Sequence, residues 1–177
     1  MKKRPYLDET IEMILEGETK EIARDFATFL RENKIRLKRA YGEHHWSSTG
    51  KSYGGGGLCS INLLDGKKKL YTGIELKNIA QYEETVISEE LQDFVLSGIK
   101  YYCGCTTRCC RGEGRITVFG KEIAGICKIE MGDNLNVDLS KIELADHVKI
   151  YFNNPDRETM AKLIRLLELE LSYAKGR

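Results

Sequence analysis

Two stretches of alternating apolar and polar residues, joined by a tight-turn signal, constrain the fold of this chain most strongly. They are LCSINLL at 58–64 and KLYTGIEL at 69–76, and Asp65-Gly66 lies between them. Alternation with a period of two is typical of a strand with one buried face, and an Asp-Gly pair favours a hairpin turn. Shorter alternating runs precede this hairpin, so residues 35–76 predict three or four antiparallel strands.

Apolar residues with helical spacing occur on both sides of these strands. Positions 22, 26, 29 and 30 lie on one side of a predicted helix, and a shorter helical stretch covers 9–15. After the strands, Ser88 is the predicted N-cap of a second long helix. The last helix is predicted to begin with Asn154 as N-cap and Pro155 at its first position.

The order of these patterns predicts an α+β fold. A cysteine-rich loop at 103–114 and two or three further strands follow the second long helix and precede the last one. The whole order is α, three or four strands, α, cysteine loop, two or three strands, α. We expect an antiparallel or mixed sheet with helices packed on one face, in a single domain 1–177.

The apolar side of the C-terminal helix is wider than one stripe. Its members are Met160, Leu163, Ile164, Leu166, Leu167, Leu169 and Leu171. Such a helix is either packed between layers or in contact with a partner subunit. A homodimer through residues 160–171 is therefore one expected assembly.

The charge balance and the shortness of the apolar runs limit the function classes. The chain has 28 Lys and Arg and 27 Asp and Glu, for a net charge of +1. A dedicated nucleic-acid binder normally shows a basic excess, so we expect no nucleic-acid partner. No run reaches the ~20 apolar residues of a membrane span, and no secretion signal is visible. We expect a cytoplasmic protein without a membrane partner, in which thiols stay reduced.

The cysteines are concentrated in one part of the chain. Cys103, Cys105, Cys109 and Cys110 stand in the segment YYCGCTTRCCRGEG, and Cys127 follows. Such clusters in a reducing compartment indicate metal binding or thiol chemistry. Three interpretations stay open: a metal site, a reactive thiol cluster, and incidental packing.

In the metal interpretation, four thiolates hold Zn²⁺ tetrahedrally. The expected ligands are Cys103, Cys105, Cys109 and Cys127, and Cys110 is the substitute for Cys109 because adjacent cysteines seldom both reach one ion. A site with four cysteine ligands has no open coordination position, so the zinc would be structural.

In the redox interpretation, the cluster from Cys103 to Cys110 cycles between thiol and disulfide. Arg108 and Arg111 flank Cys109 and Cys110 and favour their thiolate forms. The protein would then be a thiol-based redox protein or sensor.

A weaker ligand-binding signal lies in GEHHW at 42–46. Trp46 and His45 could line a concave small-molecule pocket; in the plainer interpretation Trp46 packs in the core and a histidine lies at its rim. No serine or cysteine elbow and no carboxylate pair suggests a catalytic residue. The sequence thus favours a zinc-stabilised domain that binds a small molecule or a protein and has no catalytic machinery.

The segments FGKEIAGIC at 119–127 and FNNPDRETMAKLIRLLEL at 152–169 resemble small uncharacterised bacterial proteins of the domain-of-unknown-function type. The similarity covers residues 20–171. It implies a bacterial α+β domain, and it brings neither a known activity nor a ligand set for the cysteines.

Overall fold

The computed structural model describes residues 6–40, 44–48, 57–98, 115–119, 121–124 and 148–174. The chain divides into two compact units, which are described separately below. The first is Met1–Glu75 with Tyr151–Arg177, and the second is Leu76–Ile150. A single domain spanning residues 1–177 stays a prediction.

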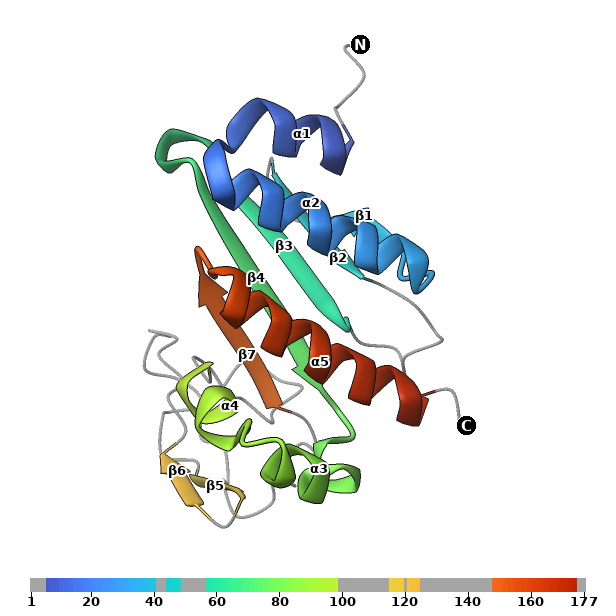
Figure 1. Ribbon diagram of the computed structural model, residues 1–177, viewed down its shortest axis with the longest axis vertical. Helices are drawn as coiled ribbons and strands as arrows, with labels where there is room; N and C mark the ends of the chain where they lie inside the picture. Colours follow the sequence, from blue (N-terminus) through green and yellow to red (C-terminus); the bar gives the residue numbers. More distant parts are fainter. Residues whose placement is uncertain are drawn as a thin grey trace, which may run out of the picture. The chain divides into compact units, whose positions relative to one another are not determined.

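The first unit is built around a five-stranded antiparallel sheet with the strand order β1-β2-β3-β4-β7. Figure 1 shows α1, α2 and α5 over the same face of this sheet. The α+β fold with helices on one face is thus confirmed. The elements are α1 (Leu7–Ile14), α2 (Gly17–Glu32), β1 (Leu37–Arg39), β2 (His45–Ser48), β3 (Cys59–Leu64), β4 (Lys69–Leu76), β7 (Val148–Asn153) and α5 (Arg157–Ala174).

The core of the first unit lies between the sheet and these three helices. Alternate residues of β3 are buried, and Ile61 is 0% exposed. Phe26 and Leu30 of α2 are 0% and 1% exposed. Each fully buried side chain of this size contributes about 1.5–3 kcal/mol through removal of apolar surface from water. Leu166 and Leu169 of α5 are also buried, whereas Ile164 on the same apolar side is partly exposed.

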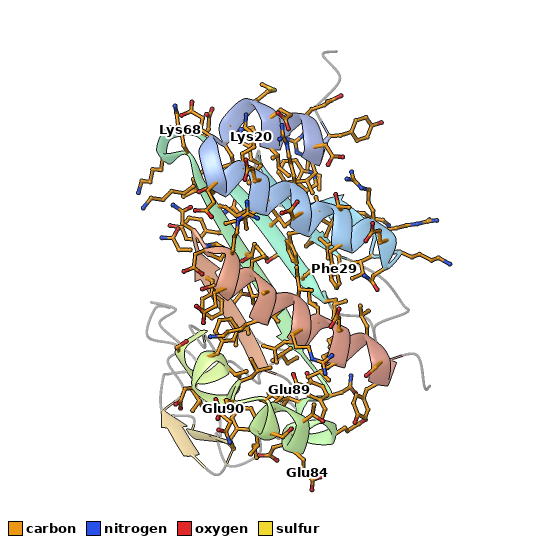
Figure 2. The ribbon with its side chains drawn as sticks, in the orientation of Figure 1. Lys20, Phe29, Lys68, Glu84, Glu89 and Glu90 are labelled. Atoms are coloured by element: carbon orange, nitrogen blue, oxygen red, sulfur yellow. The ribbon has the colours of Figure 1, made fainter. Side chains whose placement is uncertain are left out.

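Ion pairs at the surface connect α1 to α2, and α2 to the β3–β4 hairpin. Lys20 and Arg24 of α2 both pair with Glu12 of α1. The hydrogen bond from Arg24 holds the pKa of Glu12 below its usual value. Lys68 of the hairpin pairs with Glu16, ahead of α2; Figure 2 labels Lys20 and Lys68. All of these groups face water, so they orient the elements more than they stabilise them.

A second group of ion pairs joins α5 to α2. Arg157, the first residue of α5, contacts the carboxylates of Glu18, Glu21 and Asp25 at 3.2, 2.6 and 3.4 Å. One guanidinium with several donors can serve all three acids, which lie along successive turns of α2. This contact fixes the start of α5 against α2.

The second unit contains α3 (Glu83–Ser88), α4 (Gln92–Gly98) and the hairpin of β5 (Arg115–Val118) and β6 (Lys121–Ala124). The prediction that Ser88 begins a helix is wrong, because Ser88 is the last residue of α3. Glu90 has a φ of 57°, and the N–H of Leu91 donates to the carbonyl of Val86. This left-handed residue ends α3, and the next helix starts at Gln92.

The predicted N-cap of the last helix is also wrong. The cap of α5 is Asp156, whose carboxylate accepts a hydrogen bond from the N–H of Thr159 at 2.8 Å, and this bond lowers the pKa of Asp156. Asn154 instead accepts a hydrogen bond from the N–H of Leu70 in β4. The predicted tight turn between β3 and β4 is confirmed: it is a 3₁₀ turn, Asp65–Lys67, followed by Lys68 with a φ of 48°.

Candidate functional site

The five clustered cysteines, Cys103, Cys105, Cys109, Cys110 and Cys127, lie outside the described residues. Within residues 6–40, 44–48, 57–98, 115–119, 121–124 and 148–174, no group of three His, Cys, Asp or Glu side chains is placed to hold a metal ion. The zinc ligand set therefore stays a prediction from spacing.

Cys59 is the cysteine that the structure describes, and it is not a reactive thiol. Its side chain is 3% exposed in the middle of the core. Burial raises the pKa of Cys59 to about 12, and a hydrogen bond with Ser48 offsets only part of this effect. Because the thiolate is the nucleophile and the metal ligand, Cys59 stays protonated and inert at neutral pH.

Trp46 and His45 lie on opposite faces of the sheet. Trp46 is 5% exposed and stands opposite the buried Ile61, whereas His45 is partly exposed and stands opposite Asn62. Directly opposed residues in an antiparallel pair share a face. The structure therefore places Trp46 on the helix-covered side and does not bring it together with His45.

On the helix-covered side, Arg39 of β1 supports Trp46. The guanidinium carbon of Arg39 lies 5.5 Å from the centroid of the Trp46 ring, within the range of a cation–π contact. The two residues are also directly opposed in the pairing of β1 with β2. This contact anchors the short edge strand.

Ser48 provides a polar connection at the end of β2. Its hydroxyl accepts hydrogen bonds from the N–H groups of Leu58 and Cys59 at 2.7 and 2.8 Å and donates to the carbonyl of Cys59 at 3.3 Å. The side chain is buried, so these bonds satisfy backbone groups that water does not reach. Ser48 is thus a structural residue.

The face of the sheet opposite to α1, α2 and α5 carries polar and aromatic side chains. We call it the distal face; its described polar and aromatic members include Lys38, His45, Ser47, Ser60, Asn62, Lys69, Tyr71, Glu75 and Tyr151, and Leu64 and Gly73 lie on the same face. The helix-covered side is called the proximal face. These polar and aromatic members of the distal face all belong to the first unit, and all retain some exposure to water.

The strand register arranges the distal face in rows. One row runs His45, Asn62 and Tyr71 across β2, β3 and β4, because His45 opposes Asn62 and Asn62 opposes Tyr71. These side chains carry donors, acceptors and an aromatic ring next to one another. The side chains of Asn62 and Tyr71 form no hydrogen bond with any other described residue, so their polar groups can serve a ligand.

The neighbouring row is built from small residues and ends at an aromatic ring. Ser47, Ser60 and Gly73 oppose one another on β2, β3 and β4. A Cβ at Gly73 would lie 2.5 Å from two ring carbons of Tyr151, so the Tyr151 ring covers the backbone of Gly73. Only glycine permits this close approach of ring to strand. The side chains of this row are therefore short on β2, β3 and β4, and the Tyr151 ring on β7 stands at its end.

Sequence reasoning identified His45 in this face and missed Asn62, Tyr71 and Tyr151. Their signal was present in the alternation, since Asn62 and Tyr71 each stand between buried neighbours on their strands and Tyr151 follows the buried Ile150. The alternation does not show which strands pair with one another, and this pairing is what brings the three positions side by side.

The chain matches no protein-family model, and neither the curated proteins nor the solved structures gave a significant match. The resemblance to small bacterial α+β proteins stays a prediction. No helix in the described part of the chain has both the length and the apolar character needed to cross a membrane.

Proposed function

We propose that the protein is a binding domain that uses the distal face for its ligand and a four-cysteine zinc site as a structural clamp. The observation that carries the binding role is the row His45, Asn62 and Tyr71, in which hydrogen-bonding groups and a ring stand together on a rigid sheet. The buried proximal face holds this sheet in one geometry, so the row is preorganised for binding.

The zinc part of the proposal is supported by the separation of Cys59 from the other cysteines. Cys59 is buried in the core with a raised pKa, so it is not a candidate ligand. The remaining thiols are confined to residues 103–127. The proposed ligands are Cys103, Cys105, Cys109 and Cys127, and Cys110 is the substitute for Cys109. A site with four thiolate ligands stabilises the fold without supplying catalysis.

Metal analysis combined with thiol titration tests this proposal. We expect about one zinc per chain and no rapidly reacting thiol in the native protein. Cys127→Ser should remove the zinc and lower the midpoint of urea unfolding, because the free energy of metal binding contributes to folding. Cys59→Ala is the matched control, and it should keep the zinc.

The contrary result is also well defined. Metal-free protein with one or two thiols that react at once with a disulfide reagent would contradict the zinc site and favour the redox interpretation. In that case Cys109→Ser and Cys110→Ser should abolish the fast reaction while Cys59→Ala leaves it unchanged.

A further inference from the structure

The layers of the first unit differ in charge, although the whole chain is nearly neutral. The helices α1, α2 and α5 together carry ten acidic and six basic side chains. The strands β1 to β4 carry three basic side chains, Lys38, Arg39 and Lys69, and one acidic side chain, Glu75. The net charge of +1 therefore conceals an acidic helical layer and a basic sheet.

On the distal face the described charged side chains of these strands are Lys38, Lys69 and Glu75. Lys38 lies on β1 beyond Ser47, and Lys69 lies on β4 beyond Tyr71. Arg39 stacks on Trp46 on the proximal side and is not part of the distal face. Uncharged hydrogen-bonding groups lie between Lys38 and Lys69, whereas Glu75 lies at the other end of β4 from Lys69. The two lysines and the polar groups between them are complementary to a chain of phosphates with polar bases.

Two aromatic rings lie near each other on the distal face, on β4 and on the edge strand β7. Tyr151 is directly next to Gly73, and Tyr71 is two residues before Gly73 on the same strand. The two tyrosines are therefore diagonal neighbours on adjacent strands, with Cα atoms about 7–8 Å apart. Aromatic side chains on the surface of an antiparallel sheet are platforms on which unpaired bases stack.

We propose that the distal face binds single-stranded nucleic acid. Tyr71 and Tyr151 each stack on a base, Asn62 hydrogen-bonds to base edges, and Lys38 and Lys69 contact phosphates. This inference rests on the proposed binding role of the distal face and gives it a partner. It also replaces the expectation, drawn from the net charge, that the protein has no nucleic-acid partner. Phosphates respond to the local charge of the sheet and not to the acidic helices behind it.

The composition of the face argues against the other occupants. A second copy of the chain or a protein partner would bury an apolar centre free of charge. Among the described residues of the sheet, Leu64 is the aliphatic residue whose position lies on the distal face, and its neighbours there are polar. Unpaired bases need rings and hydrogen bonds instead, and the row His45, Asn62 and Tyr71 provides both.

Fluorescence anisotropy with labelled oligo(dT) and oligo(U) of about 12 nucleotides tests the inference, since this length covers a typical single-strand site. We expect binding that weakens with salt, with a slope of log K against log salt of about −1.4 for two phosphate contacts. Tyr71→Ala should weaken binding about 10-fold or more, whereas Tyr71→Phe should retain most of it. Tyr6→Ala, which alters an exposed tyrosine at the N-cap position just before α1, is the matched control and should not change the affinity.

The lysines give an independent readout. Lys38→Ala should reduce the magnitude of the salt slope by about 0.7, and Lys162→Ala on α5 should leave it unchanged. Unfolding midpoints of all variants show whether a loss of binding reflects a loss of fold. If Tyr71→Ala unfolds the protein, the comparison of Lys38→Ala with Lys162→Ala decides the question.

Several results would overturn the inference. They are the lack of salt-dependent binding to either oligonucleotide, equal affinity of the wild type and folded Tyr71→Ala, or a dimer in sedimentation experiments that Tyr71→Ala dissociates. Zinc-loaded protein that ignores both oligonucleotides defeats this inference alone. Metal-free protein that binds them through Tyr71 defeats the zinc site alone.

Discussion

The proximal and distal faces of the sheet are made from the same strands, and alternate residues supply them. Ile61 and Asn62 are adjacent in β3, yet Ile61 is fully buried and Asn62 is partly exposed. Ser48 and its neighbour Ser47 differ in the same way, since Ser48 is buried and hydrogen-bonded to backbone and Ser47 faces outward. A period of two thus assigns stability to one face and leaves the other free for recognition.

The difference between the faces has a physical origin. Side chains on the proximal face are removed from water by α1, α2 and α5, so their apolar area determines the free energy of folding. Side chains on the distal face keep contact with water, so exchanging them changes the folding free energy little. Substitutions of paired neighbours therefore test whether the two faces are as distinct as the structure indicates.

The largest effect is expected in β3. Ile61→Ala should lower the free energy of unfolding by about 2–5 kcal/mol, because it removes buried methyl groups and leaves a cavity. Asn62→Ala, one residue further along, should change it by no more than about 0.5 kcal/mol. Urea unfolding followed by circular dichroism measures both. A loss at Asn62 as large as that at Ile61 would show that the distal face is also part of the core.

A smaller effect is expected at the end of β2. Ser48→Ala should cost about 1–3 kcal/mol, because it leaves the N–H groups of Leu58 and Cys59 buried without an acceptor. Ser47→Ala removes the same hydroxyl from the outward side and should be nearly neutral. The same unfolding experiment compares them. Equal stabilities of the two variants would mean that water reaches the β2–β3 connection.

Much of the fold could be predicted from the sequence because the relevant signals are local. The alternation in 58–64 and 69–76 located β3 and β4, and the apolar spacing around Phe26 located α2. Helix ends were harder. Asn154 and Ser88 are both good N-caps by residue type. The side chain of Asn154, however, accepts a hydrogen bond from Leu70 of β4, and Ser88 is the last residue of α3. A cap depends on backbone geometry that competing partners decide.

The candidate site was less predictable for a related reason. Trp46 and His45 are adjacent in sequence, which suggested one pocket, but the pleat directs them to opposite faces. Tyr71 and Tyr151 are 80 positions apart, from residue 71 to residue 151. Only the pairing of β4 with β7 makes them neighbours, and a single sequence does not encode that pairing in any local pattern.

The smallest effect concerns the one place where the distal face is tightly packed. Gly73→Ala puts a methyl group where the Tyr151 ring lies, at 2.5 Å from two of its carbons. The ring is partly exposed and can move outward, so the expected cost is about 1 kcal/mol, at the low end for overpacking. Thermal unfolding, with Gly66→Ala as the control in a position where a Cβ meets nothing within 4 Å, measures this cost.

A second substitution at position 151 separates the clash from the intrinsic preference of the strand. If the ring is the cause, Gly73→Ala should be neutral or slightly stabilising in a Tyr151→Ser background, because the side chain that fills the space is gone. A loss that persists in that background would trace to the backbone of β4 and not to Tyr151. Since the proposed nucleic-acid site uses the same ring, Gly73→Ala should also weaken oligonucleotide binding by displacing it, while Gly66→Ala should not. The distal face would then depend on packing at this single point, and in this respect alone it would resemble the proximal face.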